Sequence, residues 1–499
     1  MLQMVSPEYY RQQPAELKES CGLFGTFYPN IPSAPHTMVG LVGVQHRGQE
    51  SAGIASSDGT KLYDHKGDGQ VFQVFHSDFD FDVLPGGISG GHDRYGTSGG
   101  SCHPQPILGE ERLFALNHNG NLPDTTKLEE FMDENNIQNP GFNDSEMMHA
   151  GIEHSVKKGA PLEEALEQAF PLFTGAWSLL LMDKEKLIAA RDPKGIRPLS
   201  IGKGHHGYAI SSETCAFDPL EISHIRDVNP GEMVIIDHNG MRTHRFAKGE
   251  EHLDAFEYAY FARPDSYLQG QKQSVEMIRR KMGKIAAIEN SDWIKRIDAD
   301  MVLGFPKSGL SSARGFAEES GIRLEEGAIV QNQYMLRTFP NPEILEHKNN
   351  GRSVIRDEKS DRAQSIRMKL NAIRELVFNK IIIATDDSLV RGNTAISSAA
   401  MLKAAGAREV HMVFSSPPVT HPDFYGIDTP VQGKLFANIY PTLEEMAAQI
   451  GVESVHFLSL EGMVEAIGVP RDRLSLSAFT GEYPIDIGKR ALEVRKIVR

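Results

Sequence analysis

The stretch KIIIATDDSLVRGNTAISSAAMLKAAGAREVHMVF, residues 380–414, contains the pattern that decides the fold of this chain. Residues 380–385 form an apolar run of strand length, and after a polar loop residues 394–405 have a helical pattern that stops at Gly406. A second apolar strand is predicted at 409–414. A strand, a helix and a strand in this order form a βαβ unit, so we predict a parallel sheet in the second half of the chain.

The polar loop inside this unit, TDDSLVRGNT, combines two adjacent carboxylates, Asp386 and Asp387, with hydroxyls and Gly392 just before a helix. Exposed N–H groups at a helix N-terminus, next to glycine, favour phosphate binding. Paired carboxylates suit ribose hydroxyls or a hard metal ion that a pyrophosphate brings with it. The alternative is an acidic turn that is merely solvated, which the combination of features disfavours.

A chain of 499 residues exceeds one ordinary core, because domains usually have ~100 to 200 residues. The charged stretch 248–254 separates a first half of short strands and glycine-rich turns from a second half of alternating helices and strands. We therefore predict four segments: a leader at 1–20, domains at 21–254 and 255–470, and a tail at 471–499.

Local patterns predict several elements on either side of this boundary. In the first half, strands are predicted at 22–27, 113–116, 177–182 and 233–236, with turns at 86–91 and 120–121. In the second half, a buried strand is predicted at 301–305, and an apolar helical face recurs at Val275, Ile278, Met282 and Ile285.

Composition excludes several classes of protein. The formal charge of −15 repels polyanions, so a nucleic-acid partner is not expected. No apolar run approaches the ~18 residues of a membrane helix, and residues 1–20 contain no signal-peptide core. Three cysteines, an odd number, favour reduced thiols over a disulfide framework. We predict a cytoplasmic protein without a membrane partner.

Cys21 opens the segment CGLFG at the edge of a predicted strand, where the neighbouring glycine leaves room for a substrate. A thiol with a free pKa of ~8.5 is a weak nucleophile. Cleavage before Cys21 would free an α-amino group that acts as a base for its own side chain. Residues 1–20 would then be a propeptide. A buried strand cysteine is the alternative.

Three further segments contain groups that could act on a carboxamide substrate. HNGNL, residues 118–122, offers the Asn119 amide and the Gly120 N–H in what we predict to be a tight turn, as donors to an oxyanion. An ordinary turn is the alternative. QHRGQESAGI and GHDRYGTSGG each place an arginine, Arg47 and Arg94, among glycines, as a carboxylate fork would require.

These four segments in this order resemble the N-terminal-nucleophile glutaminase domain of amidophosphoribosyltransferases. DSE at 144–146, RDPKGIRPL at 191–199, SSETCAFD at 211–218 and NPGE at 229–232 extend the match. The resemblance implies a four-layer αββα domain in which Cys21 attacks glutamine and Asn119 and Gly120 form the oxyanion hole. It implies glutamine-binding roles for Arg47, Arg94 and Asp144. Cys102 and Cys215 are then core or wall thiols.

The second half resembles the type I phosphoribosyltransferase domain of the same family. Besides the TDDSLVRGNT loop, the match includes FEYAYFARPDS, YMLRTF, IRMKLNAIR, SSPPVTHPDFYGIDTP and FTGEYP. The resemblance implies formation of 5-phosphoribosylamine, glutamate and pyrophosphate from glutamine, water and phosphoribosyl pyrophosphate, the opening step of purine synthesis. A loop from about 337 to 369 would close over the substrate and help to shape an ammonia channel.

The resemblance also implies a set of binding residues for phosphoribosyl pyrophosphate: Asp386, Asp387, Ser388, Arg391, Gly392, Asn393, Thr394, Arg337 and Lys369. One Mg²⁺ per subunit is expected at Ser308, Asp386 and Asp387. The family further implies a homodimer or homotetramer, and purine nucleotides as possible inhibitors.

The chain departs from the family pattern at several positions. Lys307 stands where an acidic residue is usual, Asp93 replaces an apolar residue beside Arg94, and Asn393 replaces a common threonine. We expect Asp93 either to pair with Arg94 or to weaken its grip on a carboxylate. The loop is longer than usual by roughly fifteen residues.

Some family members bind a [4Fe–4S] cluster through four cysteines. The matching positions here are Ala255 or a neighbour, Asp423, Ser475 and Ala478, and the chain has only three cysteines. We predict that no cluster binds.

Two other readings stay open at this point. A non-catalytic regulatory paralogue is suggested by Lys307, Asp93 and the long loop, and opposed by Cys21 and the paired aspartates. A glutaminase coupled to another acceptor is opposed by the phosphate loop.

Overall fold

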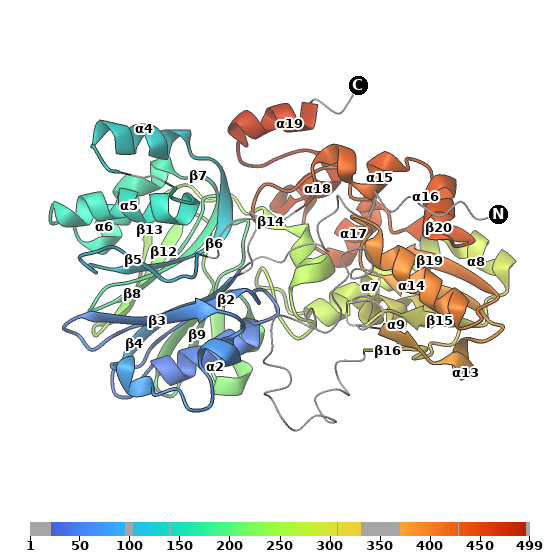
Figure 1. Ribbon diagram of the computed structural model, residues 1–499, viewed down its shortest axis with the longest axis horizontal. Coiled ribbons are helices and arrows are strands. Elements are labelled where there is room, and N and C mark those ends of the chain that lie inside the picture. Colours follow the sequence, from blue (N-terminus) through green and yellow to red (C-terminus); the bar gives the residue numbers. More distant parts are fainter. Residues whose placement is uncertain are drawn as a thin grey trace, which may run out of the picture. The chain divides into compact units, whose positions relative to one another are not determined.

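The computed structural model describes residues 21–94, 103–138, 141–306, 308–330, 370–427 and 429–495. These divide into two compact units (Figure 1). The first unit runs to Glu276 and takes in His421–Val431 and the residues from Val469 onwards, whereas the second comprises Met277–Thr420 and Gln432–Gly468. The compact units are defined by contacts within the fold, whereas the domain boundaries given above were placed from sequence motifs. Those boundaries therefore stay predictions.

Two antiparallel sheets form the centre of the first unit. Seven strands make the first sheet, in the spatial order β11 (Ser223–Asp227), β9 (Ser200–Gly204), β10 (Gly207–Ser211), β1 (Gly22–Phe27), β4 (Ile88–Arg94), β2 (Ser51–Ser57) and β3 (Leu62–Asp68). Six strands make the second, in the order β13 (Gly240–Arg245), β12 (Glu232–Asp237), β8 (Leu187–Arg191), β7 (Thr174–Met182), β6 (Ala115–Asp124) and β5 (Ile107–Leu108).

Helices cover the outer faces of both sheets (Figure 1). Helix α2 (Ala34–Val44) packs on the seven-stranded sheet, and α5 (Asp144–Lys157) and α6 (Leu162–Ala169) pack on the six-stranded one. Successive strand residues point to opposite faces, so in β1 Leu23 enters the core between the sheets while Phe24 packs under α2. Both faces of these strands are buried, and the predicted four-layer αββα fold is confirmed.

The predicted turn at 120–121 is wrong. Asn119 and Gly120 lie inside β6, paired with Ser178 and Trp177 of β7. Asparagine and glycine are typical of turns, but the ladder to β7 overrides that local preference. The turn predicted at 86–91 likewise ends early, because β4 begins at Ile88.

The second unit contains a parallel sheet of four strands, in the order β15 (Met301–Gly304), β18 (Ile381–Asp386), β19 (Glu409–Phe414) and β20 (Ser454–Phe457). Helix α14 (Asn393–Ala404) connects β18 and β19, which confirms the predicted βαβ unit. Helix α7 (Val275–Glu289) carries the predicted apolar face, and its four residues are all buried. The predicted parallel-sheet domain is therefore confirmed.

Strands β16 (Ala328–Val330) and β17 (Leu370–Ala372) pair antiparallel and enclose the long loop of the sequence. The loop itself, 331–369, lies outside the described residues, as do the predicted leader at 1–20, Cys102 and Lys307.

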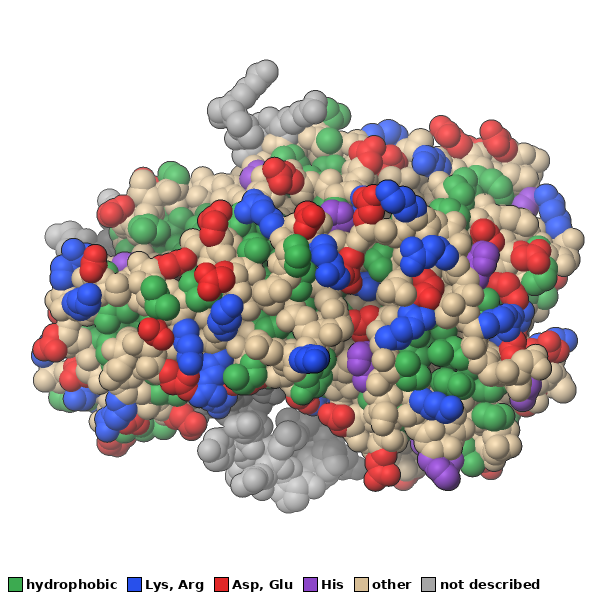
Figure 2. All heavy atoms as spheres, turned by 180° about the vertical axis from the view of Figure 1, so that it is seen from behind, with side chains coloured by type: hydrophobic (Ala, Val, Ile, Leu, Met, Phe, Trp, Pro, Cys, Tyr) green, Lys and Arg blue, Asp and Glu red, His purple; other side chains and the backbone are tan. Residues whose placement is uncertain are grey.

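Surface charge and helix hydropathy bear on the expectation that the protein has no nucleic-acid or membrane partner. On the face in Figure 2, acidic and basic side chains are interspersed, without a large basic area. None of the helices in the described ranges is both long and apolar enough to span a membrane.

Candidate active sites

Cys21 lies directly before β1, is partly exposed, and has its backbone fixed from two sides. The Arg47 guanidinium donates from Nε to the Cys21 carbonyl oxygen at 3.1 Å. The next residue, Gly22, donates its N–H to Oδ1 of Asp93 on the neighbouring strand β4 at 2.7 Å. The backbone around the predicted nucleophile is therefore held by charged side chains.

The predicted oxyanion donors lie on β6, in the opposite sheet. Asn119 is fully buried, and its Nδ2 lies 3.5 Å from the Ser212 hydroxyl, which in turn accepts the N–H of Leu23 at 3.0 Å. Ser212 thus ties the Asn119 amide to the strand that follows the nucleophile. Gly120 has φ +148°, and a Cβ there would lie 2.1 Å from the carbonyl oxygen of Ala176, so this position requires glycine.

Asp144 is the first residue of α5 and contacts the same β6 segment. Its Oδ2 accepts the N–H of Leu122 at 3.2 Å, and its Oδ1 accepts the N–H of Ser145 at 2.8 Å. His118 Nδ1 lies 2.8 Å from the Ser145 hydroxyl and 3.8 Å from Asp144 Oδ2. Burial lowers the pKa of His118, which favours the neutral imidazole. The structure thus joins the HNGNL and DSE segments.

Arg94 ends β4 and is half-buried, and its Nη1 donates to the carbonyl oxygen of His103. The expected pairing of Arg94 with Asp93 is not the contact that forms, since the Asp93 carboxylate turns towards Gly22.

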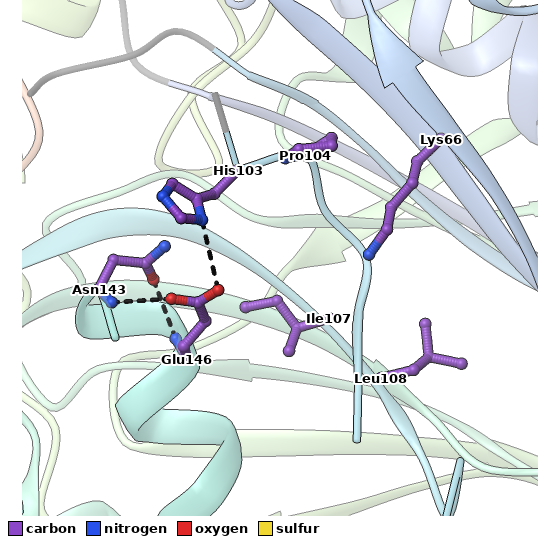
Figure 3. A pocket seen from close by; sticks show the side chains of 7 residues that line it. All are labelled: Lys66, His103, Pro104, Ile107, Leu108, Asn143 and Glu146. Atoms are coloured by element: carbon purple, nitrogen blue, oxygen red, sulfur yellow. Dashed lines mark hydrogen bonds and ion pairs between the residues drawn. The ribbon is translucent and has the colours of Figure 1, made fainter. Parts of the chain in front are cut away.

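A cavity of about 240 Å³ lies beside the N-terminal end of α5 in the first unit (Figure 3). Two of its lining residues, Asn143 and Glu146, flank Asp144 in the chain, and its polar groups already bind one another. Glu146 Oε1 lies 3.5 Å from His103 Nδ1, and Lys66 Nζ donates to the carbonyl oxygen of Pro106 at 2.7 Å. The cavity is lined by Lys66, His103, Pro104, Ile107, Leu108, Asn143 and Glu146.

Arg47 is buried, and its guanidinium is occupied by protein groups. Nη1 contacts Glu213 at 2.5 Å and Glu257 at 2.9 Å, and Nη2 contacts the second oxygen of Glu257 at 2.7 Å. Burial alone lowers the pKa of Arg47, but Glu257 and Glu213 raise it further than burial lowers it. For Glu213 the effects have the opposite signs. Burial raises its pKa, but the charges of His46 and Arg47 lower it by more, so the net pKa of Glu213 is lowered. The predicted role of Arg47 in glutamine binding stays a prediction, and the contact that it makes with the nucleophile segment is the hydrogen bond from Nε to the Cys21 carbonyl oxygen.

The ion pairs continue from Glu257 to a second buried arginine. Arg197 Nη1 lies 3.2 Å from Glu257 and 3.5 Å from Asp254, and Nη2 lies 3.7 Å from Asp423. Burial, with repulsion from Asp423, raises the pKa of Asp254 to about 7, against the opposing effect of Arg197. Sequence reasoning quoted the segments that contain these residues but missed the network. We call these residues the buried charge network: Arg47, Glu213, Glu257, Arg197, Asp254 and Asp423.

The positions compared with cluster ligands come together in the first unit. Asp254 of β14 (Leu253–Asp254) pairs with Ser475 of β21 (Leu474–Ser475), and the His421 N–H donates to the carbonyl oxygen of Ala478 at 3.0 Å. The Asp423 carboxylate accepts two backbone N–H groups, from Tyr425 and Ile427. The expectation that no iron–sulfur cluster binds rests on the cysteine count and stays a prediction.

Cys215 is a buried thiol of the first unit. Its Sγ lies 3.7 Å from Glu213, and burial, followed by the Glu213 charge, raises its pKa. These surroundings fit the predicted core thiol.

The predicted phosphate loop joins β18 to α14 in the second unit. Gly392 caps the helix with φ +81°, and a Cβ there would lie 2.3 Å from the Phe436 ring. Asn393 and Thr394 are the first helical residues, so their N–H groups have no carbonyl acceptor within the helix itself. Arg391, immediately before the cap, is buried.

Asp386 and Asp387 end β18 and are almost fully buried. Asp387 accepts the Ser308 hydroxyl on one carboxylate oxygen and the Ser388 hydroxyl, at 2.6 Å, on the other. Burial raises the pKa of Asp387, against these hydrogen bonds and the charge of Arg279. The structure therefore places the Ser308 hydroxyl against Asp387, and the magnesium-binding role of these residues stays a prediction. Arg337 and Lys369 lie outside the described residues.

Comparison with known proteins identifies the family. A family model described as a glutamine amidotransferase domain matches residues 92–219. The amidophosphoribosyltransferase of Bacillus subtilis is 38% identical over 484 residues, covering 94% of this chain and 95% of the relative. That of Synechocystis is 41% identical over 479 residues, covering 94% and 92%. The chain belongs to the amidophosphoribosyltransferase family.

A solved structure gives the same result for the fold. Glutamine phosphoribosylpyrophosphate amidotransferase from B. subtilis, complexed with ADP and GMP, has a TM-score of 0.82 and 37% identity and covers 94% of this chain and 98% of its own. The predicted fold class is thereby confirmed. So are the enzyme class, a glutamine amidotransferase that is also a pentosyltransferase, and its place at the first step of purine biosynthesis.

Proposed function

We propose that Cys21, with residues 1–20 removed, is the nucleophile of the glutaminase half-reaction. Its sulfur attacks the glutamine carboxamide carbon, and the bond to nitrogen then breaks to release ammonia and leave a thioester, which water hydrolyses to glutamate. The freed α-amino group takes the thiol proton and passes it to the leaving ammonia. The observation that carries this assignment is the Ser212 bridge between Asn119 and the strand that follows Cys21.

Asn119 and Gly120 would then donate to the oxyanion that forms during the attack. Arg94 would bind the α-carboxylate of glutamine and Asp144 its α-amino group. Support comes from the hydrogen bond between Leu122 and Asp144, which connects the amine-binding carboxylate to the oxyanion strand.

In the second unit, ammonia would attack the anomeric carbon of phosphoribosyl pyrophosphate, with loss of pyrophosphate to give 5-phosphoribosylamine. The first turn of α14 and Ser388, Arg391 and Gly392 would bind the 5′-phosphate, because the N–H groups and the dipole at a helix N-terminus, next to glycine, favour anions there. Asp386 and Asp387 would bind the ribose hydroxyls.

The residues at the end of β18 fit a magnesium ion. Mg²⁺ prefers oxygen ligands and is usually bound by one or two carboxylates together with substrate phosphates. Asp386, Asp387 and Ser308 offer such oxygens, and a cation would offset the cost of burying two adjacent carboxylates. When bound, the ion would neutralise charge on the pyrophosphate leaving group.

Further properties are proposed from the relatives alone. The B. subtilis structure holds ADP and GMP, so we expect purine nucleotides to bind and inhibit this chain as well. A homo-oligomer and a cytoplasmic location are also expected. A regulatory paralogue, or a glutaminase with another acceptor, is the outcome to test against.

The test is glutamate release that depends on phosphoribosyl pyrophosphate, with wild type beside Cys21→Ala and Asp387→Ala. Glutamate release that needs both substrates, with phosphoribosylamine synthesis from glutamine lost in each variant, supports the coupled reaction. Processed wild type without turnover in Mg²⁺ favours the paralogue. Intact mass of the purified chain tests removal of residues 1–20, and turnover by a chain that keeps them would exclude the amine as base.

A further inference from the structure

Asp93 is a fully buried carboxylate in the middle of the seven-stranded sheet. Its strand, β4, lies between β1 and β2, and its direct partners are Gly22 on one side and Ala52 on the other. Apolar residues usually occupy such positions, because an ionised side chain loses its hydration there. A carboxylate at this place therefore needs a specific partner.

One such partner is the backbone next to the nucleophile. Oδ1 of Asp93 accepts the Gly22 N–H at 2.7 Å, which is the length of a charge-assisted hydrogen bond. A Cβ on Gly22 would lie 2.3 Å from this oxygen, so the carboxylate fits only because residue 22 is glycine. Gly48 packs against the backbone of this strand, since a Cβ there would lie 2.5 Å from the backbone carbonyl carbon of Asp93. Glycine at position 22 therefore makes room for the carboxylate, and glycine at position 48 makes room for its backbone.

Only two atoms, the Cα and the carbonyl carbon of Cys21, separate the Gly22 nitrogen from the α-nitrogen of Cys21. The Asp93 carboxylate is therefore near the group that the proposed function uses as the base. Among the described residues, the other charged or titratable side chains around this segment are Arg47, whose Nε binds the Cys21 carbonyl, with Glu213, Glu257, His46 and Arg94 beyond it. Arg47 already pairs with two other carboxylates, Glu213 and Glu257, so its charge does not require Asp93 as a counter-ion.

We propose that Asp93 is a positioning residue for Cys21: it fixes the Cys21–Gly22 backbone, and its charge stabilises the protonated form of the freed α-amino group. This rests on the proposed removal of residues 1–20. An anion near the amino group strengthens it as a base, and also holds the first proton of the amine and thiol pair to higher pH. The acidic limb of the glutaminase pH profile then reports the Asp93 charge.

Activity rises as the amine and thiol pair loses its first proton, and removal of the Asp93 charge makes that proton easier to lose. In Asp93→Asn, an amide oxygen can still accept the Gly22 N–H while the charge is gone. The acidic limb of kcat/KM for glutamine should move to lower pH by about one unit. Asp93→Val removes both the charge and the acceptor, so the same shift should be joined by a fall in kcat.

The experiment measures kcat/KM for glutamine against pH, with phosphoribosyl pyrophosphate present, for wild type, Asp93→Asn, Asp93→Val and the control Asp133→Asn. Asp133 is an exposed carboxylate on α4 (Thr126–Glu134), and its profile should coincide with wild type. An acidic limb in both Asp93 variants at the wild-type pH would overturn the proposal.

Two further measurements distinguish failure of the Asp93 proposal from failure of the proposed function and from misfolding of a variant. Intact mass shows whether each variant has lost residues 1–20, and an unprocessed but active wild type refutes the proposed function itself. Synthesis from added ammonia shows whether the second unit is folded, and thermal unfolding of the same sample shows whether the first unit, which contains Asp93, is folded in a poorly active variant. If Asp93→Asn does not fold, the profile of Asp93→Val decides.

Discussion

Arg47 and Glu257 form a buried two-point ion pair, with Nη1–Oε2 and Nη2–Oε1 distances of 2.9 and 2.7 Å and no exposure of either side chain. Arg47 lies beside the predicted nucleophile, whereas Glu257 lies after the charged stretch at 248–254 that marks the sequence boundary. The pair ties Glu257 to the first compact unit, which extends beyond this residue to Glu276. A cut at 254 would leave Arg47 without one of its two carboxylates.

Substitution Glu257→Gln should destabilise the first unit strongly. Removing one partner of a buried pair leaves uncompensated charge, which typically costs about 3 to 5 kcal/mol. Glutamine keeps the shape but not the charge, and Arg197 loses a partner as well as Arg47. The melting temperature should fall by roughly 6 to 12 °C. Thermal unfolding followed by near-UV circular dichroism measures this.

The matched control is the exposed pair of Asp292 and Lys295, with side chains 92% and 74% exposed. Exposed pairs contribute about 0 to 1 kcal/mol, so Asp292→Asn should leave the melting temperature almost unchanged. Equal shifts in the two variants would contradict the structural role assigned to the buried pair.

Sequence patterns were sufficient for elements that depend on local chemistry. The run at 380–385 and the helix at 394–405 differ from β18 and α14 by one residue at each end. Strand 22–27 coincides with β1, because an apolar stretch bounded by glycine and proline has few alternatives. Ser308 was assigned to the paired aspartates by resemblance, and the structure places it there.

Sequence patterns were insufficient where long-range pairing decides the result. Arg47 binds Glu213 and Glu257, which are 166 and 210 residues away, and no spacing rule connects partners at that distance. Asn119 and Gly120 have the composition of a turn, yet the ladder to β7 extends them. Asp93 was expected to interact with Arg94, but alternate strand residues face opposite sides, and the carboxylate meets Gly22.

Substitution Asn119→Ala should impair the glutaminase half-reaction selectively. Loss of one oxyanion donor typically lowers kcat by about 10² to 10³. Synthesis of phosphoribosylamine from added ammonia should persist, because ammonia bypasses Cys21. Glutamate release and ammonia-dependent synthesis are measured on the same sample. Asn135→Ala, at the partly buried C-terminal end of α4, serves as control, and a parallel loss of both activities in Asn119→Ala would argue against an oxyanion role.

Substitution Gly392→Ala should weaken binding of phosphoribosyl pyrophosphate. A Cβ at this position meets the Phe436 ring at 2.3 Å, and φ is +81°, so the phosphate loop must shift. We expect KM for phosphoribosyl pyrophosphate to rise at least about tenfold, which corresponds to 1.4 kcal/mol. Initial rates of ammonia-dependent synthesis measure it.

Gly321→Ala provides a matched control in the same unit. Gly321 also has positive φ, +72°, but a Cβ there meets nothing within 4 Å among the described residues. It carries the backbone strain of about 1 to 2 kcal/mol without the clash, so stability should fall while KM stays near wild type. A rise in KM in both variants would assign the effect to general destabilisation.

Asp254 should make stability depend on pH in a direction opposite to ordinary acid denaturation. Its pKa in the folded state is raised to about 7 from the ordinary value of 3.8, mainly by burial and then, against Arg197, by Asp423. The folded state therefore binds more protons than the unfolded state between these values, and stability from this group is present at low pH and lost as pH rises towards 7. Asp254→Asn removes the titration, so its melting temperature relative to wild type should rise between about pH 5 and 7.

The control for this experiment is Asp472→Asn, at an exposed position of the same unit, for which the difference from wild type should stay constant across the range. Thermal unfolding of the three proteins at about half-unit steps of pH gives the comparison. Because Asp423 shares Arg197 with Asp254, Asp423→Asn should ease the ionisation of Asp254 and reduce the pH dependence. A constant difference in Asp254→Asn would mean that Arg197 keeps Asp254 ionised in the folded protein at every pH tested, and that the buried charge network is fully charged.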